Sequence, residues 1–176
     1  MHVTIALTLI CICMNQTQLL REYIELTFTE AADATTAAKK VVYTGIFLDD
    51  ASHQELLEWW EKETGTTLLG KQFGHHMTIK FKPSPEDIEK LPLGQKVSIQ
   101  VIGWAADEKG QAVLVDPEVA STNPKPHITV AVAPGGSPVY SNELLASGVT
   151  NVNGPTLKGI VDTFPREHLI KKYIDV

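Results

Sequence analysis

Two short apolar runs carry the same polar pattern at their start. The runs GHHMTIKF and KPHITVAV each place His-x-Thr ahead of largely β-branched and other apolar residues, which is typical of a strand. Side chains on a strand alternate between faces, so His76 and Thr78 point the same way, about 6–7 Å apart, as do His127 and Thr129. Two such strands lying side by side would present two imidazoles and two hydroxyls to one cleft.

The surrounding pattern predicts how the first of these strands is framed. Residues 41–48 indicate a buried strand by their length and composition. A helix then follows from a capping box at Ser52 and Glu55 to about Thr64, where Gly65 ends it. Strand, helix and the His76 strand therefore form the first part of the domain.

The second part of the chain contains a hairpin, the His127 strand and further short elements. Ser84 caps a short helix with Pro85 at its first position. Residues 96–104 alternate, and a turn at residues 107–110 leads into a partner strand. Ser141 caps another short helix, and a final strand follows. This order of elements predicts an α+β fold with antiparallel or mixed sheets, and not a doubly wound one.

The first forty residues differ from the rest, and we predict an extension at residues 1–40 ahead of a domain at residues 41–176. The extension comprises an apolar leader, an amphipathic helix from Thr17 to about Phe28 and a linker. Residues 3–14 are too few to span a bilayer and lack the flanks of a signal peptide. An edge strand, a poor signal segment, and residues ahead of a true start at Met14 remain alternatives.

Composition narrows the classes of partner. A hydrophobic share of 43% and a charged share of 20% are ordinary for a globular protein. The net charge of −6 argues against a general nucleic-acid binder, so we expect no duplex partner and no membrane association. Cys11 and Cys13 are too close together to staple the fold and too few to hold a metal. We therefore expect a cytoplasmic protein without a cofactor, and the oligomeric state is left open.

The paired His-x-Thr motifs suit the hydrolysis of a phosphodiester. That reaction needs a base to deprotonate the nucleophile, an acid to protonate the leaving oxygen, and donors for the phosphoryl oxygens. Histidine, with an unperturbed pKa of about 6.5, serves in either proton role near neutral pH. The threonine hydroxyls lie on the same strand faces and are placed to donate to the non-bridging oxygens. No metal is required for this chemistry.

Two His-x-Thr strands in a chain of this length resemble the two-histidine phosphoesterase superfamily, which includes the RNA-ligase-type 2′,3′-cyclic phosphodiesterases. The resemblance covers about residues 41–164 and implies a bilobed α+β fold, with two antiparallel or mixed sheets facing a central cleft and helices on the outer faces. It implies metal-independent catalysis with His127 as base and His76 as acid, and with Thr78 and Thr129 holding the phosphoryl oxygens.

The implied substrates are a 2′,3′-cyclic phosphate at an RNA end or a cyclic nucleotide or oligonucleotide signal. Enzymes that linearise such signals include viral ones, and a short leader ahead of a compact enzyme fits a viral protein. A third copy of the motif, His2-Val3-Thr4, opens the chain with no strand and helix before it. We interpret this copy as coincidence.

Three further residues are candidates for substrate binding. Lys80 continues the face of His76 and Thr78, and its ammonium group would help neutralise a phosphate, although a lysine at a strand end is more often solvated. Tyr43 and Trp104 lie on strands and would either stack a nucleobase or pack in the core.

Two other functions compete with phosphodiester hydrolysis. A metal site built from His75, His76 and His127 is disfavoured, because adjacent strand residues face opposite ways and no acidic residue flanks either motif. The second alternative is a nucleotide- or RNA-binding module that keeps the fold without turnover. A degenerate site of that kind is expected to have lost a histidine or threonine, and all four are present.

Overall fold

Residues 40–165 are described by a computed structural model of the chain. The predicted extension with its helix, the Met14 start, the two cysteines and the closing segment after Pro165 lie outside these residues. Within residues 40–165 no helix is long and apolar enough to cross a membrane.

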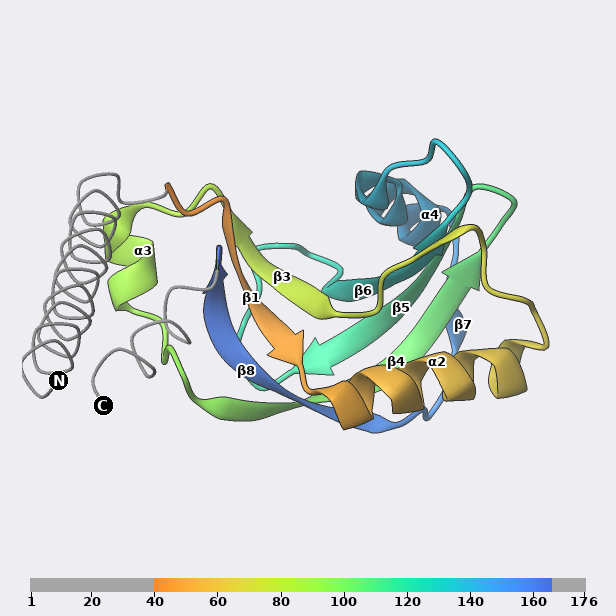
Figure 1. Cartoon of the computed structure of the whole chain (residues 1–176), viewed down its shortest axis with the longest axis horizontal. Helices are drawn as coiled ribbons and strands as arrows, with labels where there is room; N and C mark the ends of the chain where they lie inside the picture. Colours follow the sequence, from red (N-terminus) through yellow and green to blue (C-terminus); the bar gives the residue numbers. More distant parts are fainter. Residues whose placement is uncertain (1–39, 166–176) are drawn as a thin grey trace, which may run out of the picture. The chain divides into compact units, whose positions relative to one another are not determined.

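The strands of the domain form a single antiparallel sheet (Figure 1). They are β1 (Tyr43–Leu48), β2 (Lys71–Gln72), β3 (His76–Phe81), β4 (Lys96–Ala106), β5 (Gly110–Pro117), β6 (His127–Val132), β7 (Thr150–Asn151) and β8 (Thr156–Phe164). Six of them follow one another in the order β6-β3-β1-β8-β4-β5, and β5 pairs back onto β6. The sheet is therefore closed into a barrel, with β2 added to β6 and β7 added to β4.

The predicted bilobed fold with two facing sheets is wrong. β5 pairs with β4 on one side, where Val115 lies opposite Val101. On its other side β5 pairs with β6, where Val113 lies opposite Ile128. Strands that were expected to belong to separate lobes are thus neighbours in one continuous sheet. Periodicity indicates which face of a strand is buried, but it does not specify the distant strand with which it pairs.

Residues 40–165 also contain four helical segments. They are α2 (Asp50–Thr64), α3 (Pro85–Glu89), the 3₁₀ turn η1 (Pro138–Tyr140) and α4 (Ser141–Ser147). The predicted cap of α3 is confirmed, because Ser84 and Asp87 form a reciprocal capping box. The predicted cap of α2 at Ser52 is wrong: Asp49 is the N-cap, and its carboxylate accepts from the backbone N–H of Ser52 at 2.7 Å.

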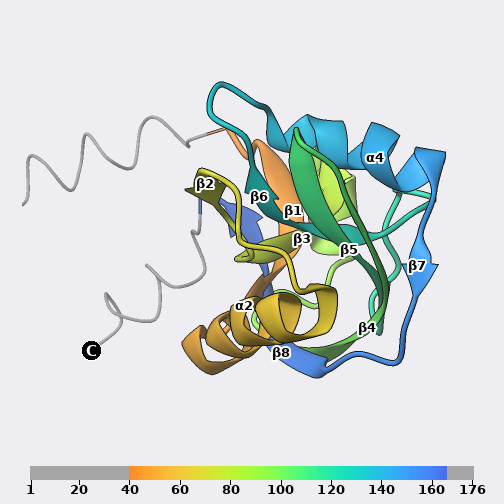
Figure 2. The same cartoon turned by 90° about the vertical axis from the view of Figure 1, so that its right-hand side faces the viewer.

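The main core joins the inner face of the strands to one face of α2. Ile46, Met77 and Ile128 are fully buried, as are Leu56 and Trp60 of α2. A smaller cluster packs Leu144 and Leu145 of α4 against β4 and β5. Figure 2 shows α2 and α4 well apart, with strands of the sheet between them. The opposite face of β3 and β6 is left for the residues of the His-x-Thr motifs.

Candidate active site

The two predicted motif strands are neighbours in the sheet. β3 and β6 run antiparallel, with Met77 opposite Ile128, and both of these side chains are buried in the core. The flanking residues therefore face the other side, with one histidine beside the threonine of the partner strand. We call these four residues the His–Thr tetrad: His76, Thr78, His127 and Thr129.

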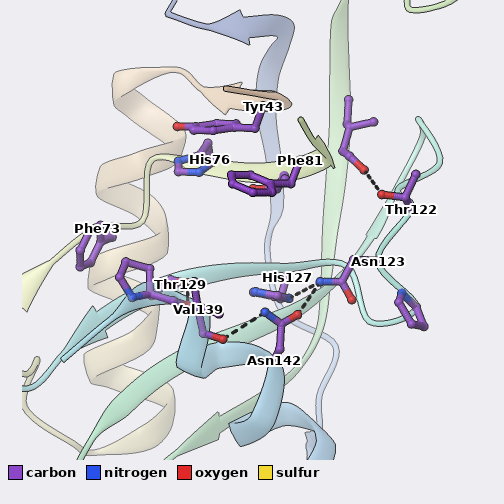
Figure 3. Close-up of a pocket in the computed structure, with 14 residues that line it drawn as sticks. Tyr43, Phe73, His76, Phe81, Thr122, Asn123, His127, Thr129, Val139 and Asn142 are labelled. Carbon is purple, nitrogen blue, oxygen red and sulfur yellow. Dashed lines mark hydrogen bonds between the residues drawn. The ribbon is translucent and has the colours of Figure 1, made fainter. Parts of the chain in front are cut away.

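All four residues of the tetrad line one pocket, with a volume of about 720 Å³ (Figure 3). Its walls are largely apolar and aromatic, and they include Tyr43, Phe73, Phe81 and Val139. Two amides, Asn123 and Asn142, also line it. An apolar cavity of this size with a few convergent polar groups is the usual form of a small-ligand site, for which volumes run from about 300 to 1,000 Å³.

Hydrogen bonding defines the proton arrangement of His127. Its Nδ1 lies 2.8 Å from the carbonyl oxygen of Lys125. A carbonyl only accepts, so Nδ1 carries the hydrogen, and in the neutral ring Nε2 has an open lone pair. Burial lowers the pKa of His127 below its ordinary value, although the bond to Lys125 acts in the opposite direction. The ring is therefore neutral at pH 7 and presents Nε2 as a proton acceptor.

Lys125, whose carbonyl orients His127, is itself held by two hydrogen bonds. The backbone N–H of Lys125 donates to the side-chain oxygen of Asn123 at 3.0 Å. The ammonium group of Lys125 donates to the carbonyl of Leu145, near the end of α4, at 2.5 Å. Asn123 also donates to Asn142 at the start of α4 at 2.7 Å. The segment before β6 is thus tied to α4, and His127 is held in place with it.

The connection from β5 to β6 passes over β3 and closes one end of the pocket. The hydroxyl of Ser121 donates to the carbonyl of Thr78 at 2.9 Å. The hydroxyl of Thr122 donates to the carbonyl of Ile79 at 2.9 Å (Figure 3). These bonds attach the connection to β3 a few residues before the chain enters β6. Asn123, the next residue of this connection, lines the pocket.

Aromatic stacking, in contrast, surrounds His76. Its ring lies 4.9 Å from that of Tyr43 with 20° between the planes, and 5.6 Å from that of Phe47 with 27°. Tyr43 stacks in turn on Phe164 of β8 at 5.0 Å. Gly45 lies between the two aromatic residues of β1, and a Cβ there would come within 2.6 Å of the Met77 carbonyl. The missing side chain lets β1 and β3 approach closely enough for these rings to stack.

The two threonines of the tetrad differ in their partners. Thr129 Oγ1 lies 2.8 Å from Ser141 Oγ and 3.3 Å from the carbonyl oxygen of Pro138. Ser141 is fully buried and is the first residue of α4; its predicted role as a helix cap is wrong, since Tyr140 is the N-cap. For Thr78, the hydroxyl has no hydrogen-bond partner within residues 40–165.

Lys80 lies apart from the pocket because a β-bulge reverses the alternation of β3. Gly45 is opposite Thr78, yet Thr44 is opposite Lys80 and Tyr43 opposite Phe81, so β3 carries one extra residue at this point. Bulges redirect side chains in this way. Phe81 is consequently the residue that lines the pocket, and the ammonium group of Lys80 forms an ion pair with Asp87 at 2.8 Å.

Two other candidates are also placed by their ring contacts. Trp104 packs edge-on against Trp60 of the core at 5.7 Å and does not line the pocket. The ring of His75 lies 4.2 Å from that of His53 on α2. Within the described part of the chain, no group of three or more His, Cys, Asp or Glu side chains is arranged to hold a metal ion.

Sequence reasoning missed Phe73, Phe81, Asn123, Asn142 and Ser141. The two phenylalanines line the pocket because of the bulge in β3 and the closure of the sheet, and neither feature has a signal in the sequence. Asn123 had a weak signal, because an Asn in a Pro-containing connection commonly fixes a turn, and this one lies four residues before a motif histidine.

Comparisons with known proteins find likenesses among solved structures. No protein-family model and no curated protein matches the sequence. Among solved structures, the chain is similar to a fungal RNA kinase, with a TM-score of 0.49 and 16% sequence identity over 72% of this chain. The match spans 45% of the length of the kinase chain.

Proposed function

We propose that this protein is a metal-independent phosphoesterase that hydrolyses a cyclic or strained phosphodiester of a nucleotide or an RNA end. The observation that carries the proposal is the tetrad: two imidazoles and two hydroxyls from adjacent strands line one pocket. The neutral His127, with its Nδ1 hydrogen bonded to Lys125, supports its role as the base. The resemblance to two-histidine phosphoesterases points to the same chemistry.

In the proposed reaction, Nε2 of His127 removes a proton from water as the water oxygen attacks phosphorus. A new P–O bond forms, and the bond from phosphorus to a ribose oxygen breaks. His76 donates a proton to that leaving oxygen, so the product is a phosphomonoester and a free hydroxyl when the substrate is cyclic. Thr78 and Thr129 donate to the non-bridging oxygens, where negative charge increases in the transition state.

The test is an assay of the purified full-length protein in EDTA. The panel contains 2′,3′-cyclic mononucleotides, cyclic di- and trinucleotides, and RNA ending in a cyclic phosphate, with products identified by mass spectrometry. We expect turnover of at least one substrate in EDTA and its loss in His76→Ala and His127→Ala. Turnover abolished by EDTA and restored by a divalent metal would overturn the metal-independent mechanism. Binding without any turnover would indicate the nucleotide- or RNA-binding module instead.

A further inference from the structure

Phe81 forms an exposed aromatic platform at one side of the pocket. Its side chain is 60% exposed, and the ammonium group of Lys82 lies 5.4 Å from the centre of its ring. Lys82 has a φ of +49°, which is uncommon for a residue other than glycine. Its N–H donates to the carbonyl of Val42 at 2.8 Å. This hydrogen bond to the residue before β1 stabilises the backbone conformation that places the Lys82 ammonium group over the Phe81 ring.

Phe73 forms a second platform with the same composition. The ammonium group of Lys71 lies 5.1 Å from the centre of the Phe73 ring. The backbone N–H of Phe73 donates to the carbonyl of Val130 on β6 at 2.7 Å, and its carbonyl accepts from Nε2 of His53 on α2 at 2.8 Å. Bonds to two different elements therefore hold the residue that carries this ring.

The two Phe–Lys pairs lie at opposite ends of the His–Thr tetrad. Phe73 precedes β3 and Phe81 ends it, and Figure 3 shows them on either side of His76. Both rings line the pocket. Within residues 40–165 neither Lys71 nor Lys82 takes part in an ion pair, whereas Lys80 does. Their charges are thus available to a ligand.

Tyr43 is poorly suited to receive a base on its ring face. It lies between the rings of His76 and Phe164, which reach it from the neighbouring strands β3 and β8. Phe73 and Phe81 are the pocket-lining rings that lie outside this stack. A planar base stacks on an aromatic ring, and a nearby cation favours the phosphate that accompanies the base.

We infer that the substrate carries at least two nucleobases, one stacked on Phe73 and one on Phe81, with the reacting phosphate between them at the tetrad. This inference rests on the proposed function and narrows its substrate class to oligonucleotides, cyclic or ending in a cyclic phosphate, over single nucleotides. The pocket volume of about 720 Å³, in the upper half of the usual range for ligand sites, accommodates such a ligand.

The kinetic test compares a 2′,3′-cyclic mononucleotide with a dinucleotide that ends in the same cyclic nucleotide. We expect the wild type to show a higher kcat/KM for the dinucleotide by about 5- to 150-fold, the range that stacking of one base provides. Phe73→Leu and Phe81→Leu should each lower kcat/KM for the dinucleotide by a factor in that range. The mononucleotide occupies one platform only, so in at least one of the two variants the loss of kcat/KM should be larger for the dinucleotide than for the mononucleotide.

Two results would overturn the inference: equal kcat/KM for the two substrates in the wild type, or proportional losses on both substrates in both variants.

The salt dependence of dinucleotide binding supplies a second readout. Lys71→Gln and Lys82→Gln should each reduce the slope of log K against log salt for dinucleotide binding by about 0.7. Lys62→Gln, which removes an exposed lysine of α2, is the matched control and should leave the slope unchanged.

Binding measured without catalysis separates this inference from the proposed function. Calorimetric titration of the His76→Ala/His127→Ala protein with the dinucleotide should give a Kd that Phe73→Leu weakens. If the wild type hydrolyses nothing and this weakening is still observed, the two-base site stands and the proposed hydrolysis fails. If hydrolysis occurs and Phe73→Leu changes neither binding nor the substrate ratio, the two-base site fails and the hydrolysis stands.

Discussion

The two halves of the candidate site have the same His-x-Thr sequence but different surroundings. In the β3 half, His76 is stacked on Tyr43 and Phe47, and the hydroxyl of Thr78 has no partner among residues 40–165. In the β6 half, His127 donates to a backbone carbonyl, and the hydroxyl of Thr129 contacts that of Ser141. Ring stacking is prominent in the β3 half, and directed hydrogen bonds are prominent in the β6 half.

The difference bears on which histidine takes which role. A hydrogen bond from Nδ1 to a carbonyl selects one tautomer, so His127 presents a fixed acceptor, as a base requires. The acid of such a mechanism gives up a proton and is then reprotonated, so it must pass between two protonation states, whereas a fixed tautomer suits the base. The hydrogen bond of His127 is therefore the feature that supports the base role implied for it by the resemblance.

The largest expected effect follows from removing either imidazole. His127→Ala and His76→Ala should each lower kcat by about 10²- to 10⁴-fold, the usual contribution of a general acid or base. Both side chains are only half-buried, so the melting temperature should change little.

A substrate with a nitrophenolate leaving group separates the two halves, because such a group departs without protonation. We expect this substrate to restore much of the activity of His76→Ala and little of that of His127→Ala. The opposite pattern would reverse the roles of the two histidines.

The threonines should show the next largest effect. Thr78→Val and Thr129→Val each remove a donor to the phosphoryl oxygens, and we expect losses in kcat of about 10²- to 10³-fold. Thr129 has one hydroxyl proton, which cannot serve Pro138 and a substrate at once. If Ser141 donates to Thr129 Oγ1, the proton of Thr129 is left for the Pro138 carbonyl or, when substrate is bound, for a phosphoryl oxygen.

A double-mutant cycle tests this positioning role. Ser141→Ala should lower kcat about 2- to 10-fold, the range for one hydrogen bond, and should have no further effect in a Thr129→Val background. Ser147→Ala is the matched control, because its hydroxyl donates to the carbonyl of Leu144 in its own helix and to no other group of the described residues. Full additivity of Ser141→Ala and Thr129→Val would show that Ser141 acts independently of Thr129.

Sequence patterning predicted the local elements of the site but neither the closed sheet nor the residues brought in by distant pairing. The motif strands and their shared face follow from alternation, since Met77 and Ile128 are apolar and their neighbours are polar. Lys80 was misplaced because a bulge depends on how β1 pairs with β3. Ser141 was interpreted as a cap because a serine before a helix carries the same local signal whether its hydroxyl bonds to the helix or to another strand.

The pH dependence is a smaller expected effect, and the acid limb of the profile should report on the β6 half. Burial lowers the pKa of His127 below 6.5. If this residue is the base, kcat/KM should fall on the acid side with an apparent pKa below 6.5, because the profile reports the free enzyme. An acid limb above 6.5 would argue against His127 as the base.

The same shift affects stability. Between pH 6.5 and the lower pKa of folded His127, the unfolded state binds more protons than the folded state. The contribution of His127 to the free energy of unfolding is therefore fully present above pH 6.5 and is lost as the pH falls through that interval. His127→Asn should make this decrease smaller in denaturant titrations at a series of pH values. An identical decrease in the wild type and the variant would show that other groups account for it.

The smallest expected effect comes from Lys80, and it tests the bulge directly. By strict alternation Lys80 would share the face of His76 and Thr78, and Lys80→Met would then reduce kcat/KM through loss of a charge near the phosphate. In the structure Lys80 is paired with Asp87, which keeps the pKa of that carboxyl well below its usual range. We therefore expect Lys80→Met to leave kcat/KM unchanged, whereas Phe81→Leu, one residue further, lowers it. A loss in Lys80→Met without a loss in Phe81→Leu would mean that β3 is not bulged and that the lysine faces the pocket.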